Sequence, residues 1–339
     1  MKFHINKSSI IKFIWCLIFV ISCDQDGPTN GEENIIPEEA IPFDNLGSGK
    51  LVFHRTFTEY YGIYVIDLDD RSFSRIPEIL FESPVISPDG EKIAFRSYAG
   101  SETAWDIFIM KIDGSEKQSL SKIKGNGERL PGWDLNSESV FYFVNIYPHS
   151  LLRQPAYPTI GQKVSVKRYS GFQTFDSRVD VSVNNRLVFV KRESGGTPKI
   201  YSIDISGLNE LDIAPEQIGD NERIFSPSWS PDGERIAYIS ILMDSLDYPV
   251  SQEIVLIDAD GSNRYSVAKF ENFKRITIGN YFNDNAVSLC WSPDGSKIAF
   301  TLPNENAKFH VYAIQIDGSN FIQVTTADSA IDRSVSWSK

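Results

Sequence analysis

The sequence is short of the residues that most enzymes use for catalysis and metal binding. Its 339 residues include only three cysteines, three methionines and four histidines. None of the histidines, which are His4, His54, His149 and His310, has a second His or Cys at the spacing of a zinc site. The G-x-S-x-G pattern of a hydrolase nucleophile and the full G-x-x-x-x-G-K-[ST] phosphate loop are also absent. We therefore expect no catalytic residues, no metal and no cofactor.

Basic residues are also in deficit. The chain holds 33 Lys and Arg against 45 Asp and Glu, which gives a formal net charge of −12. Proteins that bind nucleic acid present basic patches to the phosphate backbone, so we expect no nucleic-acid partner. The same charge disfavours adsorption to anionic lipid and makes a neutral or cationic partner easier to accommodate.

Long apolar runs are missing except near the N-terminus, where residues 14–22 read IWCLIFVIS. With the lysines before it, the segment 1–22 has the pattern of a secretory signal peptide, which is too short for a membrane-spanning helix. It ends Val20-Ile21-Ser22-Cys23, which resembles a bacterial lipobox, so we predict lipidation at Cys23. The alternative is an ordinary signal peptide beside a chance cysteine. Removal of 1–22, which holds three lysines and no acidic residue, would take the net charge from −12 to −15.

The segment 23–46 is acidic, contains Pro and Gly, and has no apolar period. We expect it to be a disordered tether between the lipidated Cys23 and a folded domain over 47–339. The remaining cysteine of the mature chain, Cys290, is expected to be a buried packing residue without a disulfide partner.

A short phrase repeats along the rest of the chain. It reads SPDGEKIAF from Ser87, WSPDGERIAY from Trp229 and WSPDGSKIAF from Trp291, with weaker copies from Trp133 and Val181. Apolar and polar residues alternate on both sides of a Pro-Asp-Gly turn, which predicts strand, tight turn and strand. A third apolar run ending in Asp-Gly and a fourth strand follow each good copy. Each unit is thus predicted to be a four-stranded antiparallel meander.

The repeated Asp and Trp residues have structural explanations. We interpret the aspartates as turn formers and the tryptophans as packing between units. These residues are Asp89, Asp232, Asp294, Trp229, Trp291 and Trp337.

Six units can be counted from the aromatic residue that ends each second strand. Its spacings are 42, 47, 47, 49 and 62 residues, close to the repeat length of propeller blades, and it occurs at Phe53, Phe95, Tyr142, Phe189, Tyr238 and Phe300. The first unit, from Gly49, lacks its first strand, and Ser334–Ser338 at the end of the chain supplies one. We predict an all-β, six-bladed β-propeller of four-stranded antiparallel blades, closed by the C-terminal strand completing blade one.

The WSPDGxxIAF phrase, followed by a strand and Asp-Gly-Ser, resembles the WD-like "Pro-Asp" β-propeller repeat of the TolB family over roughly residues 47–339. The resemblance implies a periplasmic scaffold that links envelope proteins. The same repeat occurs in the propeller domains of peptidases and in sugar-acid lyases, so it specifies the fold more closely than the function.

Strand direction places all the tight turns on one face, and the connections between second and third strands and between blades on the other. Three segments predicted as long loops fall on the second face: Asn145–Lys163, Ile241–Gln252 and Phe270–Ala286. Aromatic residues and Arg are enriched at binding interfaces. We predict that this face binds a partner, although the same side chains could instead pack on each other. The candidate residues are Tyr147, His149, Arg153, Tyr157, Tyr248, Phe273, Arg275, Tyr281 and Phe282.

The favoured function is a lipid-anchored, non-enzymatic, monomeric TolB-like propeller that binds an envelope protein or peptide. We expect it at the outer membrane, facing the periplasm or the cell surface. One alternative is a carbohydrate-binding or glycan (sugar-acid) lyase-type lipoprotein, with His149, Arg153 and Tyr157 at the mouth of the tunnel. Another is a structural spacer.

Overall fold

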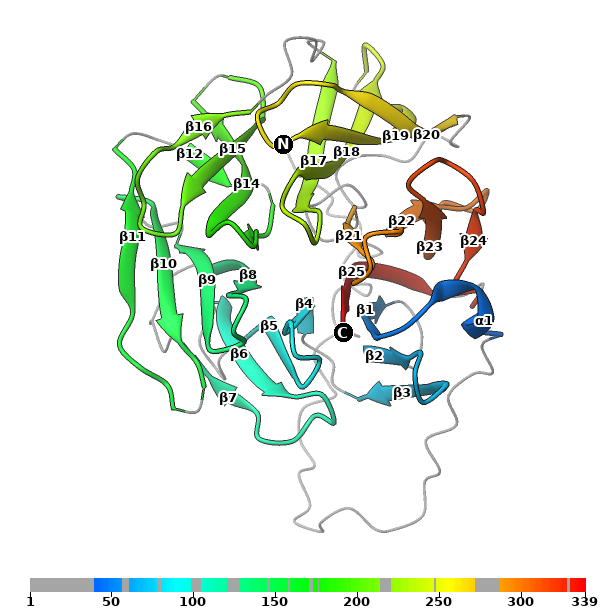
Figure 1. Ribbon diagram of the computed structural model, residues 1–339, viewed down its shortest axis with the longest axis horizontal. Coiled ribbons are helices and arrows are strands. Elements are labelled where there is room, and N and C mark those ends of the chain that lie inside the picture. Colours follow the sequence, from blue (N-terminus) through cyan, green and yellow to red (C-terminus); the bar gives the residue numbers. More distant parts are fainter. Residues whose placement is uncertain are drawn as a thin grey trace, which may run out of the picture. The chain divides into compact units, whose positions relative to one another are not determined.

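Six antiparallel sheets make up the described part of the chain and follow one another around a central axis (Figure 1). The computed structural model describes residues 40–56, 61–77, 81–98, 105–120, 128–144, 147–157, 159–170, 173–175, 177–194, 196–213, 221–246, 248–271, 287–327 and 330–339. All of them belong to one compact unit over Ile36–Lys339. The predicted all-β, six-bladed propeller is confirmed.

Each blade is a meander whose first strand is innermost. Blade one contains β25 (Ile331–Ser338), β1 (Lys50–Thr56), β2 (Gly62–Asp67) and β3 (Ser72–Ile76). Blade two contains β4 (Phe81–Ile86), β5 (Lys92–Tyr98), β6 (Trp105–Lys111) and β7 (Gln118–Ser119). Blade three contains β8 (Glu128–Trp133), β9 (Ser139–Val144), β10 (Ser150–Pro155) and β11 (Val164–Arg168).

The other three blades continue the ring. Blade four contains β12 (Gln173–Phe175), β13 (Asp180–Val181), β14 (Arg186–Glu193), β15 (Lys199–Asp204) and β16 (Leu211–Asp212). Blade five contains β17 (Glu222–Trp229), β18 (Arg235–Met243), β19 (Pro249–Asp258) and β20 (Tyr265–Glu271). Blade six contains β21 (Leu289–Trp291), β22 (Lys297–Pro303), β23 (Phe309–Gln315) and β24 (Ile322–Gln323).

Blade four departs from the predicted pattern. Its inner position is divided between β12 and β13, which both pair with β14, so this sheet has five strands rather than four. The sequence of this unit has lost the Pro-Asp-Gly phrase, and the inner strand is interrupted between Phe175 and Asp180.

The ring closes through the predicted pairing of β25 with β1. The two strands are antiparallel, with Ser338 opposite Lys50 and Asp332 opposite Arg55. Without this pairing both strands would be exposed edges, which attract other chains.

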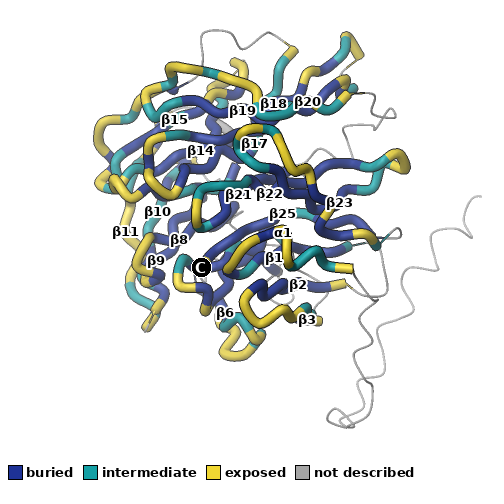
Figure 2. The backbone as a smooth tube through the Cα atoms, turned by 45° about the vertical axis from the view of Figure 1, so that its right-hand side comes forward, coloured by how far each residue is buried: buried dark blue, intermediate teal, exposed yellow. Residues whose placement is uncertain are grey.

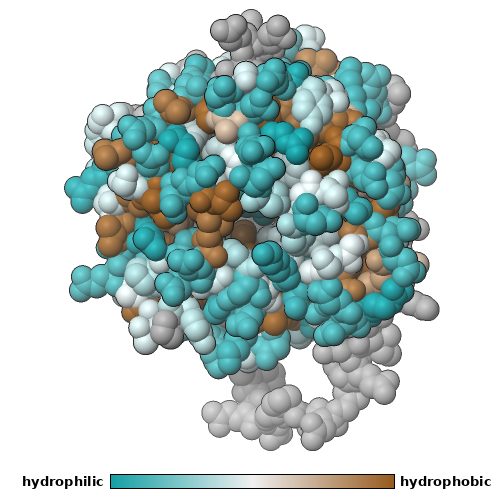
Figure 3. All heavy atoms as spheres, in the orientation of Figure 1, coloured by the Kyte–Doolittle hydropathy of each residue, from teal (hydrophilic) through white to brown (hydrophobic). Residues whose placement is uncertain are grey.

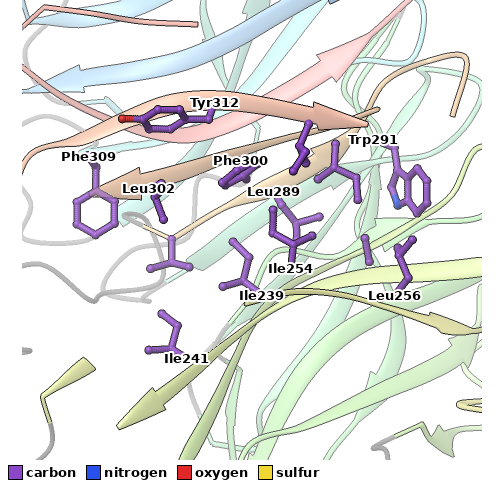
Figure 4. Packing of buried hydrophobic residues seen from close by; sticks show 14 of the residues in the cluster. Ile239, Ile241, Ile254, Leu256, Leu289, Trp291, Phe300, Leu302, Phe309 and Tyr312 are labelled. Atoms are coloured by element: carbon purple, nitrogen blue, oxygen red, sulfur yellow. The ribbon is translucent and has the colours of Figure 1, made fainter. Parts of the chain in front are cut away.

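The core lies between neighbouring blades. The six aromatic residues that mark the repeat are all fully buried in second strands, at 0 % exposure. Figure 4 shows one inter-blade cluster, in which Ile239 and Leu256 of blade five pack with Leu289 and Trp291 of blade six. Burying each such side chain stabilises the fold by about 1.5–3 kcal/mol. In Figure 2 the strands are mostly buried, and exposed residues gather at the turns.

A buried ion pair lies where β25 meets β1. Arg55 donates from Nε and Nη2 to the two carboxylate oxygens of Asp332, at 2.7 and 2.9 Å, and both side chains are at most 1 % exposed. Burial would raise the pKa of Asp332, but the nearby His310 imidazole and the Arg55 hydrogen bonds outweigh it and hold the pKa below its usual range. Burial lowers the pKa of the neighbouring His54 to about 3. His54 and His310 are both buried at this junction, at 6 % and 1 % exposure.

Two of the three segments predicted as long loops contain strand, so the prediction that they are loops throughout is wrong. Strand β10 lies inside 145–163, and the ends of β18 and β19 fill most of 241–252. The alternation of β10 was hard to recognise because its pairing with β11 is interrupted between Leu151 and Leu152. The third segment begins within β20, and 272–286 lies outside the described residues.

The signal peptide, Cys23 and most of the predicted tether lie outside the described residues, so these assignments stay predictions. The last residues of that tether are described and pack on the propeller: α1 (Phe43–Leu46) buries Leu46, which is 1 % exposed, against blade one. Within the described residues, no helix has the length and apolar character needed to cross a membrane.

Candidate functional site

The tight turns of the blades share one face of the ring, as predicted. In blade two Lys92 pairs with Lys111, which places the first and last turns of the blade at the same end of the sheet. We call this end the turn face and the opposite end the loop face. In blade five, Ser230 Oγ donates to Asp232 Oδ1, and this hydrogen bond lowers the pKa of Asp232. The same bond joins Ser87 to Asp89 and Ser292 to Asp294, which supports the turn-forming role of these aspartates.

The tryptophans of the inner strands join neighbouring parts of the ring. Trp133 Nε1 donates to the carbonyl of Val85 in the preceding blade, and Trp291 Nε1 donates to that of Ser228, both at 3.0 Å. Trp337 Nε1 donates to Ser48 O at the same distance. Each indole also belongs to an apolar cluster shared with the preceding blade, so inter-blade packing is confirmed.

Trp229 occupies the equivalent place in blade five but differs from the other three tryptophans. It is 5 % exposed and packs with Val188 and Val190 of blade four. Its indole Nε1 is buried and has no acceptor among the described residues. A buried donor without a partner is uncommon in proteins and calls for an explanation.

A cavity of about 720 Å³ occupies the turn-face half of the central channel. All six blades contribute inner-strand residues, including the tryptophans Trp133, Trp229, Trp291 and Trp337. The rim is formed by residues of the turns, and Leu135 and Val183 are 40 % and 51 % exposed there. Figure 3 shows a hollow at the centre of the ring.

Two charged residues of blade four lie in this mostly apolar wall. Arg178 reaches across the channel, where Nη1 donates to Val335 O of blade one at 3.0 Å and Nη2 to Leu289 O of blade six at 2.6 Å. Asp180 Oδ2 accepts from Ser228 Oγ at 2.8 Å and from the Trp229 backbone N–H at 2.7 Å. Burial raises the pKa of Asp180.

Neither residue was predicted from the sequence, although a signal was present. When the blades are aligned on the turn that follows the inner strand, the Arg178 position holds Ser83, Leu130, Ser226, Ser288 and Ser334 in the other five. The Asp180 position holds Val85, Gly132, Ser228, Cys290 and Ser336. Blade four alone places charges at these two inner positions.

The residues predicted for partner binding fall in separate places. Tyr147 is 68 % exposed in the β9–β10 turn at the loop face, whereas His149 beside it is buried against Phe175. Tyr248 is half-buried and closes the β18–β19 hairpin: its carbonyl accepts from the Asp244 N–H, and its own N–H donates to Asp244 Oδ1.

Arg153 and Tyr157 lie at the other end of blade three, since Pro155 pairs with Ser139 next to the first turn. Arg153 forms an ion pair with Asp134 at 3.0 Å. The Lys92 ammonium lies over the Tyr157 ring in a cation–π contact. Arg153 and Tyr157 both line a second, smaller hollow of about 280 Å³.

Of the five candidates that are described, none lines the central cavity. Phe273, Arg275, Tyr281 and Phe282 lie outside the described residues. A role of any of the nine in binding a partner stays a prediction.

The described residues offer little chemistry for catalysis. His54, His149 and His310 are all buried, at 6 %, 6 % and 1 % exposure. No group of His, Cys, Asp and Glu among the described residues could hold a metal ion. Cys290 is buried in the cavity wall, and burial raises the pKa of its thiol to about 12, so it is a packing residue as predicted.

No protein-family model matches the chain. It is similar to TolB. It is 33 % identical over 91 residues to the Tol-Pal system protein TolB of Hydrogenovibrio crunogenus, covering 26 % of this chain and 19 % of the relative. It is 29 % identical over 146 residues to that of Anaeromyxobacter dehalogenans, covering 43 % and 28 %. The matches thus span less than a third of each relative's length.

Solved structures share the fold. The crystal structure of TolB from Acinetobacter baumannii aligns with a TM-score of 0.65 at 16 % identity, over 86 % of this chain and 66 % of that one. An oligogalacturonate lyase in complex with manganese aligns with a TM-score of 0.53 at 13 % identity, over 85 % and 76 %. Propellers of this shape therefore include both a TolB protein and an enzyme.

Proposed function

We propose that the chain is a TolB-like propeller of the bacterial cell envelope that binds a protein or peptide partner and has no catalytic activity. The observation that carries the proposal is the cavity at the turn face, whose wall combines apolar side chains, four indole rings among them, with polar and charged groups. Binding pockets typically have this composition and a volume of about 300–1,000 Å³. The similarity to Tol-Pal system proteins supports an envelope setting.

The cavity is the primary contact in this proposal, and the loop-face residues are secondary. Leu135 and Val183 stand on the rim with much of their side chains exposed. The loop-face candidates are instead distributed over blades three and five, and His149 is buried. Contacts that converge on one concave surface bind more tightly than the same contacts dispersed over a face.

Charging the rim tests this assignment. We expect the double variant Leu135→Asp/Val183→Asp to lower recovery of the partner about tenfold, because it puts two carboxylates on an apolar contact. Recovery would be measured by cross-linking in envelope extract followed by quantitative mass spectrometry. The control is Leu208→Asp, because Leu208 is 65 % exposed and lies outside the cavity. Equal recovery by all three proteins would count against the cavity as the binding surface.

The alternative function is a glycan-binding or sugar-acid lyase propeller. It is favoured by the small hollow that contains Arg153 and Tyr157, since a cation and an aromatic ring are suited to acidic sugars. Incubation with a polysaccharide panel, with both binding and unsaturated products as readouts, tests it. The alternative is abandoned if no glycan gives either signal.

The lipid anchor is the second part of the proposal and places the protein at the outer membrane, facing the periplasm or the cell surface. We expect Cys23→Ala to shift at least nine-tenths of the protein from the membrane pellet to the soluble fraction. Acyl chains contribute about 0.8 kcal/mol per buried methylene, so losing them abolishes stable attachment. Cell fractionation measures the shift, with Cys290→Ala as the matched control. A Cys23→Ala protein that stays in the pellet would refute the anchor.

A further inference from the structure

Arg178 is a cation placed in the wall of the cavity. Its side chain starts from the interrupted inner strand of blade four and donates to two backbone carbonyls on other blades, Leu289 O and Val335 O. A guanidinium has five N–H donors in a planar fork. The two carbonyl bonds use only part of that capacity, and carbonyls bring no negative charge.

The acidic residues near Arg178 are occupied elsewhere. Asp89 forms an ion pair with Lys92 at 2.6 Å, at the rim of the cavity. Asp180 lies near enough for the charge of Arg178 to oppose the rise that burial causes in its pKa, but its Oδ2 accepts from Ser228 Oγ and the Trp229 backbone N–H rather than from Arg178. Among the described residues, no carboxylate lies within ion-pair distance of Arg178. Lys339, the other charged residue of the lining, is exposed.

Arg178 is partly buried in this cavity and forms no ion pair with the residues described. A ligand carboxylate would bring it a directly bonded counter-charge through two parallel hydrogen bonds, which are stronger than bonds to neutral carbonyls. Trp229 also belongs to the cavity wall, but its Nε1 lies beneath the surface without an acceptor in the described part of the chain, whereas the three equivalent indoles all have one.

We propose that the cavity binds a peptide through one carboxylate, with Arg178 as the anchor. This inference rests on the proposed function and specifies the chemistry of its partner. A peptide is favoured because the wall also contains four indole rings and other apolar side chains beside Ser and Asn residues, which suits apolar side chains and backbone amides together. One carboxylate is expected rather than an acidic run, because the net charge of −12 repels polyanions.

A selection from a library of random heptapeptides tests the proposal without knowledge of the partner. The library is displayed once with free C-termini and once with amidated C-termini, which separates α-carboxylates from side-chain carboxylates. We expect the wild-type protein to select peptides that carry a carboxylate. A selected peptide should bind at least tenfold more tightly than the same peptide with that group converted to an amide, as expected for a charge-assisted bond. Tryptophan fluorescence gives the Kd, because four of the six tryptophans line the cavity.

Variants of Arg178 and of a control arginine test whether Arg178 causes the preference for carboxylate peptides. Arg178→Gln should abolish the tenfold preference, and Arg168→Gln, which removes the same charge from an exposed position on β11, should keep it. Arg178→Lys, which retains the charge without the fork, serves if the Gln variant fails to fold by circular dichroism, and it should keep only part of the preference.

Three results would overturn the proposal. The first is equal binding of carboxylate and amide peptides by the wild-type protein. The second is a preference that survives in Arg178→Gln. The third is binding of oligogalacturonate in the cavity without any selected peptide. If rim variants still reduce partner recovery while no carboxylate preference is found, the proposed function stands and the Arg178 anchor alone is wrong.

Discussion

Replacing Asp332 by alanine is expected to lower the free energy of unfolding by about 3–5 kcal/mol. The reason is that Arg55, which is 1 % exposed, would keep its charge in the interior with its main partner gone. Because domains of this kind are stable by about 5–15 kcal/mol, the loss is a large share of the total. Urea unfolding followed by tryptophan fluorescence gives the value.

A double variant shows whether Asp332→Ala loses stability because the charge of Arg55 is left unpaired or because packing contacts are lost. Arg55→Met/Asp332→Leu removes both charges and fills similar space, and such replacements are often neutral or stabilising. We expect it to recover most of the stability that Asp332→Ala loses. Since the pKa of Asp332 is lowered in the folded state, its contribution is complete above the unfolded value of about 3.9 and is lost as the pH falls below it. The double variant should lack this acid dependence, and a double variant no more stable than Asp332→Ala would contradict the interpretation.

Deleting residues 331–339 is expected to abolish cooperative folding. The deletion removes β25 and with it Ile331, Val335 and Trp337, which are 1 %, 0 % and 8 % exposed. At about 1.5–3 kcal/mol for each side chain, the loss is about 5–9 kcal/mol and comparable to the whole stability of a domain. Differential scanning calorimetry should show no unfolding transition.

A synthetic peptide of residues 330–339 supplies the control for that deletion. Added to the shortened protein, it can pair with β1 and is expected to restore the transition in a concentration-dependent manner. A peptide of scrambled sequence should not. An unchanged melting transition in the shortened protein would show that β25 contributes little to the ring.

The fold could be predicted from the sequence because its evidence is local and repeated. The Ser-Pro-Asp-Gly turns, the alternating strands and the buried aromatic positions from Phe53 to Phe300 each depend on residues close in the chain. Closure by Ser334–Ser338 was also predictable, since the first unit lacks an inner strand and this segment has the sequence of one.

The candidate site could not be predicted in the same way, because it is assembled from all six inner strands. The cavity brings together residues such as Ile86, Trp229 and Trp337, which are far apart in the sequence. The aromatic residues of the segment that contains β10 led to the prediction of a binding site there. In the structure, Arg153 of this segment pairs with Asp134 and His149 is buried. Arg178 can be recognised from the sequence only when blade four is compared with the other blades position by position. Blade four is the one that departs most from the repeat.

Closure by β25 and β1 also has a consequence for assembly. The Arg55–Asp332 pair joins residues 277 positions apart, so one chain's β1 stays open until its own last strand arrives. During that interval the final strand of a second copy offers the same hydrogen bonds and the same carboxylate. Two chains that refold at high concentration can therefore exchange these strands and form a domain-swapped dimer. The concentration at which the protein folds, rather than the one at which it is stored, would then set the ratio of monomer to dimer.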